Sequence, residues 1–323
     1  MPSKTRSVAL LGVVLAAAGS ALAQSGYPAK TIRIISPFPP GGSVDAVARL
    51  IANDLAKPLG QQIVVDNRSG ASGNIGMELV KNAPPDGYTL VLNTLPLVTN
   101  QFLYSKVPYD ALGDFTPISL ISASPSMLTV HPSVPVKSVK DLIALAKSQP
   151  GKLNYGTAGL ATNPHICGEL FNYLAKTNIV AVHFKGGGPA LIATMSGETE
   201  LTFSNISETV PLVLSGRLRG LGVTSLKRSR LVPDIPTMVE AGVPGYEFTT
   251  WHALLGPKGL PATVLDTLSE KVRATLRTPE ETQRFSDRGL DVIAGTPDEL
   301  AAHLKSETGK WGHVMKERGM RAE

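Results

Sequence analysis

The sequence predicts an α/β protein of two domains, and three observations carry that prediction. Strand-like and helix-like runs alternate from residue 31 onward, which favours sheets flanked by helices. The alternation falls into two blocks, residues 31–94 and a second block beginning near residue 138. Two long strand-like segments, 117–132 and 246–257, lie where the blocks meet. Two connections indicate that one domain is inserted into the other, with the ligand site in the cleft between them.

The first block has a βαβαβ pattern. The run TIRIIS predicts a strand, and a helix follows from Ser43 with its apolar residues at helical spacing on one face. QQIVVDN predicts the second strand and YTLVLNT the third, separated by a helix around NIGMELVKNA that ends at the turn 84–87. Strands joined in this way run parallel, so we expect a parallel sheet flanked by helices.

The second block repeats the alternation and can form a sheet of its own. Strands are expected at LNYGT, IVAVHF, LTFSN and RGLGVTS, with helices near 163–176, 188–197 and 207–215. The chain then returns to the first domain with the helix PATVLDTLSEKVRATLRT, a short strand LDVIAG and a final helix. Capping-box spacing marks two helix starts, at Ser138 with Asp141 and at Thr296 with Glu299.

Residues 1–23 have the pattern of a secretory signal peptide. Lys4 and Arg6 precede a short apolar run, and residues 21–23 form an A-x-A cleavage site. We expect cleavage before Gln24 and a periplasmic location. An uncleaved membrane anchor is the alternative, which the shortness of the run disfavours.

Composition excludes several function classes. The net charge of +5 comes from 31 basic and 26 acidic residues that are dispersed, so nucleic-acid binding is not expected. Cys167 is the only cysteine, which rules out an intramolecular disulfide, and we predict a small buried residue rather than a nucleophile. The histidines lack metal-ligand spacing, so we predict neither a metal nor a cofactor.

Two turns between a strand and a helix have the character of anion sites. The first is PGGS at 40–43, and the second is GTAGLATN at 156–163, followed by Pro164. The first N–H groups of a helix lack internal partners and carry partial positive charge, and glycines let a ligand approach the backbone. Ser43 is expected to cap the first helix, and Thr162 or Asn163 the other. The alternative to an anion site is that the glycines are there for steric reasons alone, as they are in many turns between a strand and a helix. If the two turns face each other across a cleft, their backbone N–H groups could together bind a carboxylate.

Long segments of the chain resemble the Bug-type periplasmic solute-binding proteins of tripartite tricarboxylate transporters. The resemblance runs through the mature chain in the family's order, and the segments that carry it are YPAKTIRIISPFPPGGSVDAVARLIANDLAKPLGQQIVVDNRSGASGNIGMELVKNAPPDGYTL, KLNYGTAGLATNPHICGELF, HFKGGGPALIATMSGETELTFSNI and RLRGLGVTSLKRSRLVPDIPTMVEAGVPGYEFTTWHALLGPKGLP. It implies a type II, Venus-flytrap binding-protein fold. The implied domains are 24–124 with 247–323, and 125–246 inserted between them.

The resemblance also implies the function and the site. A monomeric receptor would hold a small carboxylate in the cleft, partly through bridging waters, and deliver it to the membrane permease of the transporter. The implied ligand-binding residues are Phe38, Pro40, Gly41, Gly42, Ser43, Asp45, Asn67, Ser72, Thr94, Thr157, Ala158, Gly159, Ala161, Thr162, Asn163, His165, Lys185, Gly186, Ser204, Asn205 and Trp251.

Several of these residues have a second interpretation. Trp251 is also expected in the core of the hinge and Lys185 as a solvated surface charge. For His165, an ordinary residue of the first helical turn is favoured over a ligand contact. Phe184 stands where the family usually has Tyr, which removes a hydroxyl. Family members often have an acidic residue at the position of Ser204, so its absence disfavours an amino-acid ligand.

Two other functions remain as alternatives. A periplasmic hydrolase would need a catalytic constellation, and the sequence contains neither a G-x-S-x-G elbow nor an H-E-x-x-H motif. An accessory protein of a sensor kinase would have the same pocket and a different partner, which the sequence does not separate from a transport receptor.

Overall fold

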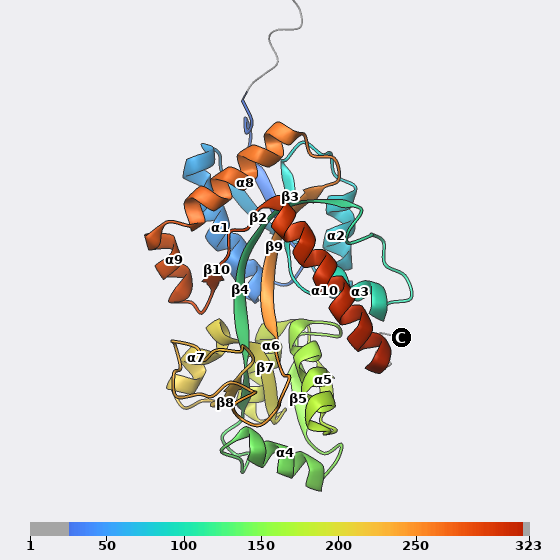
Figure 1. Ribbon diagram of the computed structural model, residues 1–323, viewed down its shortest axis with the longest axis vertical. Helices are drawn as coiled ribbons and strands as arrows, with labels where there is room; N and C mark the ends of the chain where they lie inside the picture. The colour runs from blue at the N-terminus through green and yellow to red at the C-terminus, as the bar shows by residue number, and fades with distance from the viewer. Residues whose placement is uncertain (1–25, 319–323) are drawn as a thin grey trace, which may run out of the picture.

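The computed structural model describes residues 26–318, so the expected signal peptide lies outside the described residues. Two lobes stand one above the other along the longest axis of the molecule (Figure 1). We define the upper lobe as residues 26–125 with 249–318 and the lower lobe as residues 126–248, from the change in strand pairing described below. The predicted α/β class is confirmed.

The upper lobe is a sheet covered by helices on both faces. Strands β1 and β2 pair in parallel, as do β1 and β3, while β9 is antiparallel to β3. Ile34 of β1 packs with α1, α8 and α9, whereas its neighbour Ile35 packs with α2, α3 and α10. The elements are β1 (Ile32–Ser36), α1 (Ser43–Leu59), β2 (Ile63–Asn67), η1 (Ala71–Gly73), α2 (Asn74–Lys81), β3 (Thr89–Asn93), α3 (Pro96–Leu103), β9 (Thr249–Pro257), α8 (Ala262–Leu276), α9 (Pro279–Ser286), β10 (Asp291–Val292) and α10 (Pro297–Arg318).

The lower lobe repeats the same architecture at smaller scale. Strand β5 lies between β6 and β7 and is parallel to both. The elements are α4 (Val139–Ser148), β5 (Asn154–Thr157), α5 (Asn163–Ala175), β6 (Val180–His183), α6 (Gly187–Ser196), β7 (Leu201–Asn205), α7 (Ile206–Leu214) and β8 (Arg219–Val223).

A single long strand, β4 (Phe115–Val130), runs through both lobes (Figure 1). Up to Pro125 it pairs with β9, and from Ser126 it pairs with β7 and β8. The lower sheet therefore shares a strand with the upper one, and the strand order β2-β1-β3-β9-β4-β7-β5-β6 is continuous. The domain limits of 24–124 with 247–323 and of 125–246 stay a prediction.

The two capping boxes predicted from the sequence differ in how completely they form. The capping box at Thr296 is complete: the Glu299 N–H donates to Thr296 Oγ1 over 3.2 Å, and Glu299 Oε2 accepts from the Thr296 N–H over 2.7 Å. At Ser138 only half of the box forms, because the Asp141 carboxylate accepts from the Lys137 N–H instead. Helices α3 and α9 were not predicted from the sequence.

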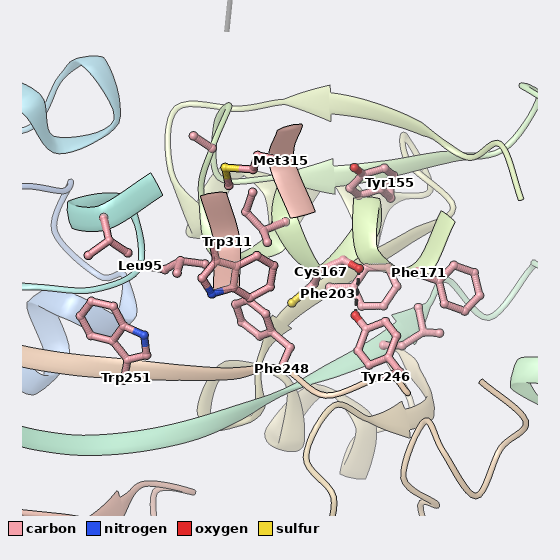
Figure 2. Close-up of a cluster of buried hydrophobic side chains, with 14 of the residues drawn as sticks. Leu95, Tyr155, Cys167, Phe171, Phe203, Tyr246, Phe248, Trp251, Trp311 and Met315 are labelled. Carbon is pink, nitrogen blue, oxygen red and sulfur yellow. Dashed lines mark hydrogen bonds between the residues drawn. The ribbon is translucent and has the colours of Figure 1, made fainter. Parts of the chain in front are cut away.

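A cluster of aromatic side chains packs where the lobes meet (Figure 2). The Phe248 and Trp311 rings lie 5.7 Å apart, which joins the lower lobe to α10. Trp251 is 2% exposed, and its indole N–H donates to Glu307 Oε2 over 2.9 Å, as does the Trp311 indole N–H. Trp251 is therefore part of the buried core where the two lobes meet, which is the second interpretation given for it above.

Cys167 lies in the same cluster. Its side chain is completely buried, burial raises the pKa of the thiol, and its carbonyl accepts from the Tyr246 hydroxyl over 2.8 Å. The prediction of a small buried residue is confirmed.

Candidate functional site

A partly open cavity of about 90 Å³ lies between the lobes and is lined by both. The upper lobe contributes the turn before α1 and the start of α3, and the lower lobe contributes the starts of α5, α6 and α7. The lining residues are Phe38, Pro39, Pro40, Gly42, Ser43, Val44, Thr94, Pro96, Ser126, Ala158, Thr162, Asn163, Pro164, Gly186, Gly187, Gly188, Pro189, Phe203, Asn205 and Glu208.

Within residues 26–318, five helices begin at this cavity, and for four of them the residue before the first turn also lines it. These four residues are Gly42 for α1, Thr162 for α5, Gly186 for α6 and Asn205 for α7. None of the four helix starts is closed by a side-chain hydrogen bond. Unpartnered N–H groups and the positive ends of the helix dipoles therefore converge there. No Lys, Arg or His is among the lining residues, so the attraction for an anion comes from the backbone.

The turn before α1 is shaped by a carboxylate that stays out of the cavity. Gly41 has φ +86°, which favours glycine, and its N–H donates to Asp45 Oδ2 over 3.0 Å. Asp45 Oδ1 accepts from Asn67 Nδ2 over 2.9 Å, and Arg49 Nε donates to Oδ2 over 3.1 Å. Ser43 is the first helical residue and Gly42 precedes it, so the expectation that Ser43 caps the helix is wrong. Asp45 and Asn67 thus fix the conformation of the turn.

The electrostatics of Asp45 agree with this supporting role. Burial alone would raise the pKa of its carboxyl, but the hydrogen bonds from Arg49, the Gly41 N–H and Asn67 hold that pKa below its usual value. The carboxyl is therefore ionised at neutral pH and accepts all three bonds.

We expect Asp45→Ala to lower the free energy of unfolding by about 1–3 kcal/mol at neutral pH, because three donors lose their acceptor. Since the folded-state pKa is depressed, this contribution is present above the pKa of the unfolded chain and is lost as pH falls through the folded-state value. Urea unfolding of wild type and variant at pH 7 and at low pH measures the difference. A gap that stays constant down to low pH would contradict the assignment.

The turn before α5 is organised by its own side chains. Thr162 Oγ1 donates to the Gly159 carbonyl over 2.7 Å, and Thr157 Oγ1 lies 2.7 Å from His183 Nδ1. Ala161 has φ +64°, and its N–H donates to His165 Nδ1 over 3.2 Å. Burial, followed by the neighbouring His183, lowers the pKa of His165 to about 4, so its ring is neutral and can accept. Thr157, Gly159, Ala161 and His165 shape this turn and do not line the cavity.

Direct contacts join the two lobes beside the cavity. Ser72 Oγ in the upper lobe donates to the Leu160 carbonyl in the lower lobe over 2.6 Å. Asn163 Nδ2 donates to Thr94 Oγ1 over 3.3 Å and to Thr250 Oγ1 over 3.0 Å. Gly186 has φ +116°, and a Cβ there would lie 3.4 Å from the Pro39 ring. Ser72 therefore joins the two lobes beside the cavity without lining it.

The structure brings ten of the predicted site residues to the cavity and leaves eleven outside its lining. Those at the cavity are Phe38, Pro40, Gly42, Ser43, Thr94, Ala158, Thr162, Asn163, Gly186 and Asn205. Those outside are Gly41, Asp45, Asn67, Ser72, Thr157, Gly159, Ala161, His165, Lys185, Ser204 and Trp251. Lys185 is exposed at the surface, as its second interpretation had it.

Ser204 is outside the cavity because of strand geometry. Successive residues of a strand face opposite sides, and in β7 Phe203 and Asn205 both line the cavity. Ser204 points the other way, and its hydroxyl lies 3.1 Å from Thr202 Oγ1. The residue type at position 204 is therefore a poor guide to the ligand.

Ten lining residues were not predicted. The run Gly186–Pro189 has the same small-residue turn from strand to helix as the two predicted turns, so that signal was available. Ser126, Phe203 and Glu208 carry no local signal, because only the tertiary fold brings them to the cavity. The residues missed are Pro39, Val44, Pro96, Ser126, Pro164, Gly187, Gly188, Pro189, Phe203 and Glu208.

Comparison with known proteins agrees with this architecture. The model of the tripartite tricarboxylate transporter family receptor matches residues 47–320. The chain belongs to this family. It is 34% identical to the protein BugT of Bordetella pertussis over 319 residues, which cover 98% of each chain. The resemblance found in the sequence is thereby confirmed.

Solved structures of family members show the same fold. R. palustris Rpa4515 with adipate has a TM-score of 0.89 and 37% sequence identity, covering 91% of this chain and 99% of its own. MatC from Rhodopseudomonas palustris with bound malate has a TM-score of 0.84 and 32% identity, covering 89% and 99%. Each of these two structures contains a carboxylate. The α/β binding-protein fold that the resemblance implies is confirmed.

Proposed function

We propose that this receptor captures a small organic carboxylate in the cavity between its lobes and delivers it to the permease of a tripartite tricarboxylate transporter. The observation that carries the proposal is the convergence of four uncapped helix N-termini on one cavity between the lobes, whose lining residues include no basic side chain. Backbone N–H groups and helix dipoles suit a carboxylate, and the enclosing lobes strengthen these interactions by excluding water.

Capture without catalysis fits the side chains of the cavity. Glu208 is the one titratable side chain among the lining residues of the described chain. Hydrolysis by a side-chain nucleophile requires a base within hydrogen-bond reach of the nucleophile, and a third group usually orients that base. A single titratable side chain does not make up such a set, so the cavity favours binding over hydrolysis. Relatives with adipate and with malate support binding as the activity.

The location and the partner follow from the family and from the leader sequence. The pattern at residues 1–23 supports export to the periplasm. None of the helices in the described part of the chain is long and apolar enough to cross a membrane. The cross-lobe contacts of Ser72 and Asn163 would form only on closure, so the closed surface gives the permease a means to recognise the loaded receptor.

A thermal-shift screen tests the proposal. The mature protein, residues 24–323, is unfolded and refolded to remove any carried ligand and is then screened against organic acids, amino acids, phosphate esters and sugars. A ligand that binds only the native state raises its melting temperature, and we expect this from a subset of the carboxylates. Stabilisation by sugars or phosphate esters alone, or consumption of a screened compound, would contradict the proposal.

A further inference from the structure

Glu208 is the only charged side chain among the cavity-lining residues of the described chain. It lies in the first turn of α7. Its Oε2 and Oε1 atoms are 3.7 Å and 3.9 Å from the position that a Cβ on Gly187 would occupy, so the carboxyl group stands beside the N-terminus of α6. An acidic group thus lies inside a cavity whose backbone attracts anions.

The Glu208 carboxyl group has no protein partner. Neither a hydrogen bond nor an ion pair joins it to any other residue within 26–318, and the side chain is partly buried at the cavity wall. Burial raises its pKa to about 7, and no neighbouring charge contributes to this shift. The carboxyl group faces the cavity as a hydrogen-bond acceptor that no protein donor occupies, so a donor on a ligand can reach it.

A carboxylate at this position acts differently on different ligands. The free N–H groups at the helix starts can bind one carboxylate of a ligand. A second ligand carboxylate near Glu208 would face a like charge at short range, which disfavours the state in which both groups are ionised. An alkyl end would leave Glu208 without a partner, whereas an ammonium or hydroxyl group would donate to it.

We propose that Glu208 determines specificity by accepting a hydrogen bond from the ligand, so that the preferred ligand is a carboxylic acid bearing an ammonium or hydroxyl donor. This inference rests on the proposed function and narrows its substrate class. It reverses the expectation drawn from Ser204, because that residue faces away from the cavity and Glu208 faces into it.

Two series of acids with matched carbon skeletons test the inference. The first is hexanoate, ε-aminohexanoate, ε-hydroxyhexanoate and adipate, and the second is butyrate, γ-aminobutyrate, γ-hydroxybutyrate and succinate. Binding of each acid to refolded protein is measured by calorimetry at pH 8, where Glu208 is mostly ionised. In the series whose length fits, we expect the donor-bearing acids to bind at least about tenfold more tightly than the alkyl acid and the dicarboxylate.

The matched variants are Glu208→Gln and the control Glu198→Gln, an exposed glutamate of the same lobe. We expect E208Q to weaken the ammonium acid by about tenfold and to strengthen the dicarboxylate, because the amide is neutral and can donate to a carboxylate. E198Q should leave every affinity unchanged. A folded E208Q protein is verified by its unchanged melting temperature or by its binding of the dicarboxylate.

The number of protons released or taken up on ligand binding gives an independent test of the role of Glu208. At pH 7 the ammonium acid should release protons on binding, because its charge favours the ionised form of Glu208, and the dicarboxylate should take protons up. The dependence of the binding enthalpy on buffer ionisation measures both, and E208Q should remove it.

Two results separate this inference from the proposed function. Dicarboxylates or alkyl acids that bind as tightly as their donor-bearing partners, with no change in E208Q, overturn the role of Glu208 and leave carboxylate capture standing. A protein that none of the screened carboxylates stabilises overturns the proposed function itself.

Discussion

Replacing Gly42 with leucine should weaken carboxylate binding by at least about 100-fold and leave the fold intact. A side chain in the position before a helix lies over the first N–H groups of that helix, so an apolar one covers the donors that we assign to the ligand. The backbone tolerates the change, because Gly42 has φ −82° and ψ 170°, and a Cβ there meets only the Pro39 carbonyl at 3.8 Å.

Calorimetry with the tightest acid from the screen measures the loss, and far-ultraviolet circular dichroism with urea unfolding verifies the fold. Gly42→Ala serves as the size control, with a smaller loss expected from its single methyl group. Gly309→Leu serves as the remote control, since a Cβ at Gly309 meets no atom within 4 Å and the residue lies on α10. Unchanged affinity in Gly42→Leu would exclude the start of α1 from the ligand site.

Replacing Glu307 with alanine should have the largest effect on stability, lowering the free energy of unfolding by about 2–4 kcal/mol. The indole N–H groups of Trp251 and Trp311 both donate to Glu307 Oε2, and both indoles are 2% exposed. Removal of the carboxylate leaves two buried donors without an acceptor at the junction of α10 with β9.

Urea unfolding followed by tryptophan fluorescence measures this effect, because the chain's two tryptophans are the two donors. Lys305→Ala, at an exposed position of the same helix, is the control and should change stability little. If Glu307→Ala unfolds at the same urea concentration as wild type, the two indole hydrogen bonds contribute nothing measurable to the hinge.

The sequence was informative about the fold where local pattern and tertiary structure agree. The run from TIRIIS into the helix at Ser43 predicts β1 and α1, since four of the five β1 residues are buried and the apolar residues of α1 recur at helical spacing. Helix α9 could have been predicted as well, because Thr278, Pro279 and Glu281 form an N-terminal signature in which Thr278 accepts from the Glu281 N–H.

The site was predictable in outline and not in detail. The small-residue turns before α1 and α5 identify helix starts that face a cleft, and both do line the cavity. Which residue of a turn faces the ligand depends on how the side chains fold back. Asp45 turns away from the cavity to hold Gly41, a geometry that spacing along the chain does not reveal.

Glu208 illustrates what sequence alone cannot supply. From the sequence alone it is an acidic residue in the first turn of a helix, and a favourable interaction with the helix dipole is enough to explain an acidic residue there. Only the packing of α7 beside α6 places its carboxyl group in the cavity, next to Gly187. The position of Ser204 was misjudged for the related reason that strand alternation decides which side chains face inward.

The most direct test of the account is a crystal structure of the mature protein with the tightest-binding carboxylate from the screen. We expect the ligand between the lobes, with its carboxylate oxygens within hydrogen-bond distance of backbone N–H groups in the first turns of α1 and of the lower-lobe helices. A carboxylate held outside this cavity, or held by a basic side chain such as Lys185, would contradict backbone capture at the helix N-termini.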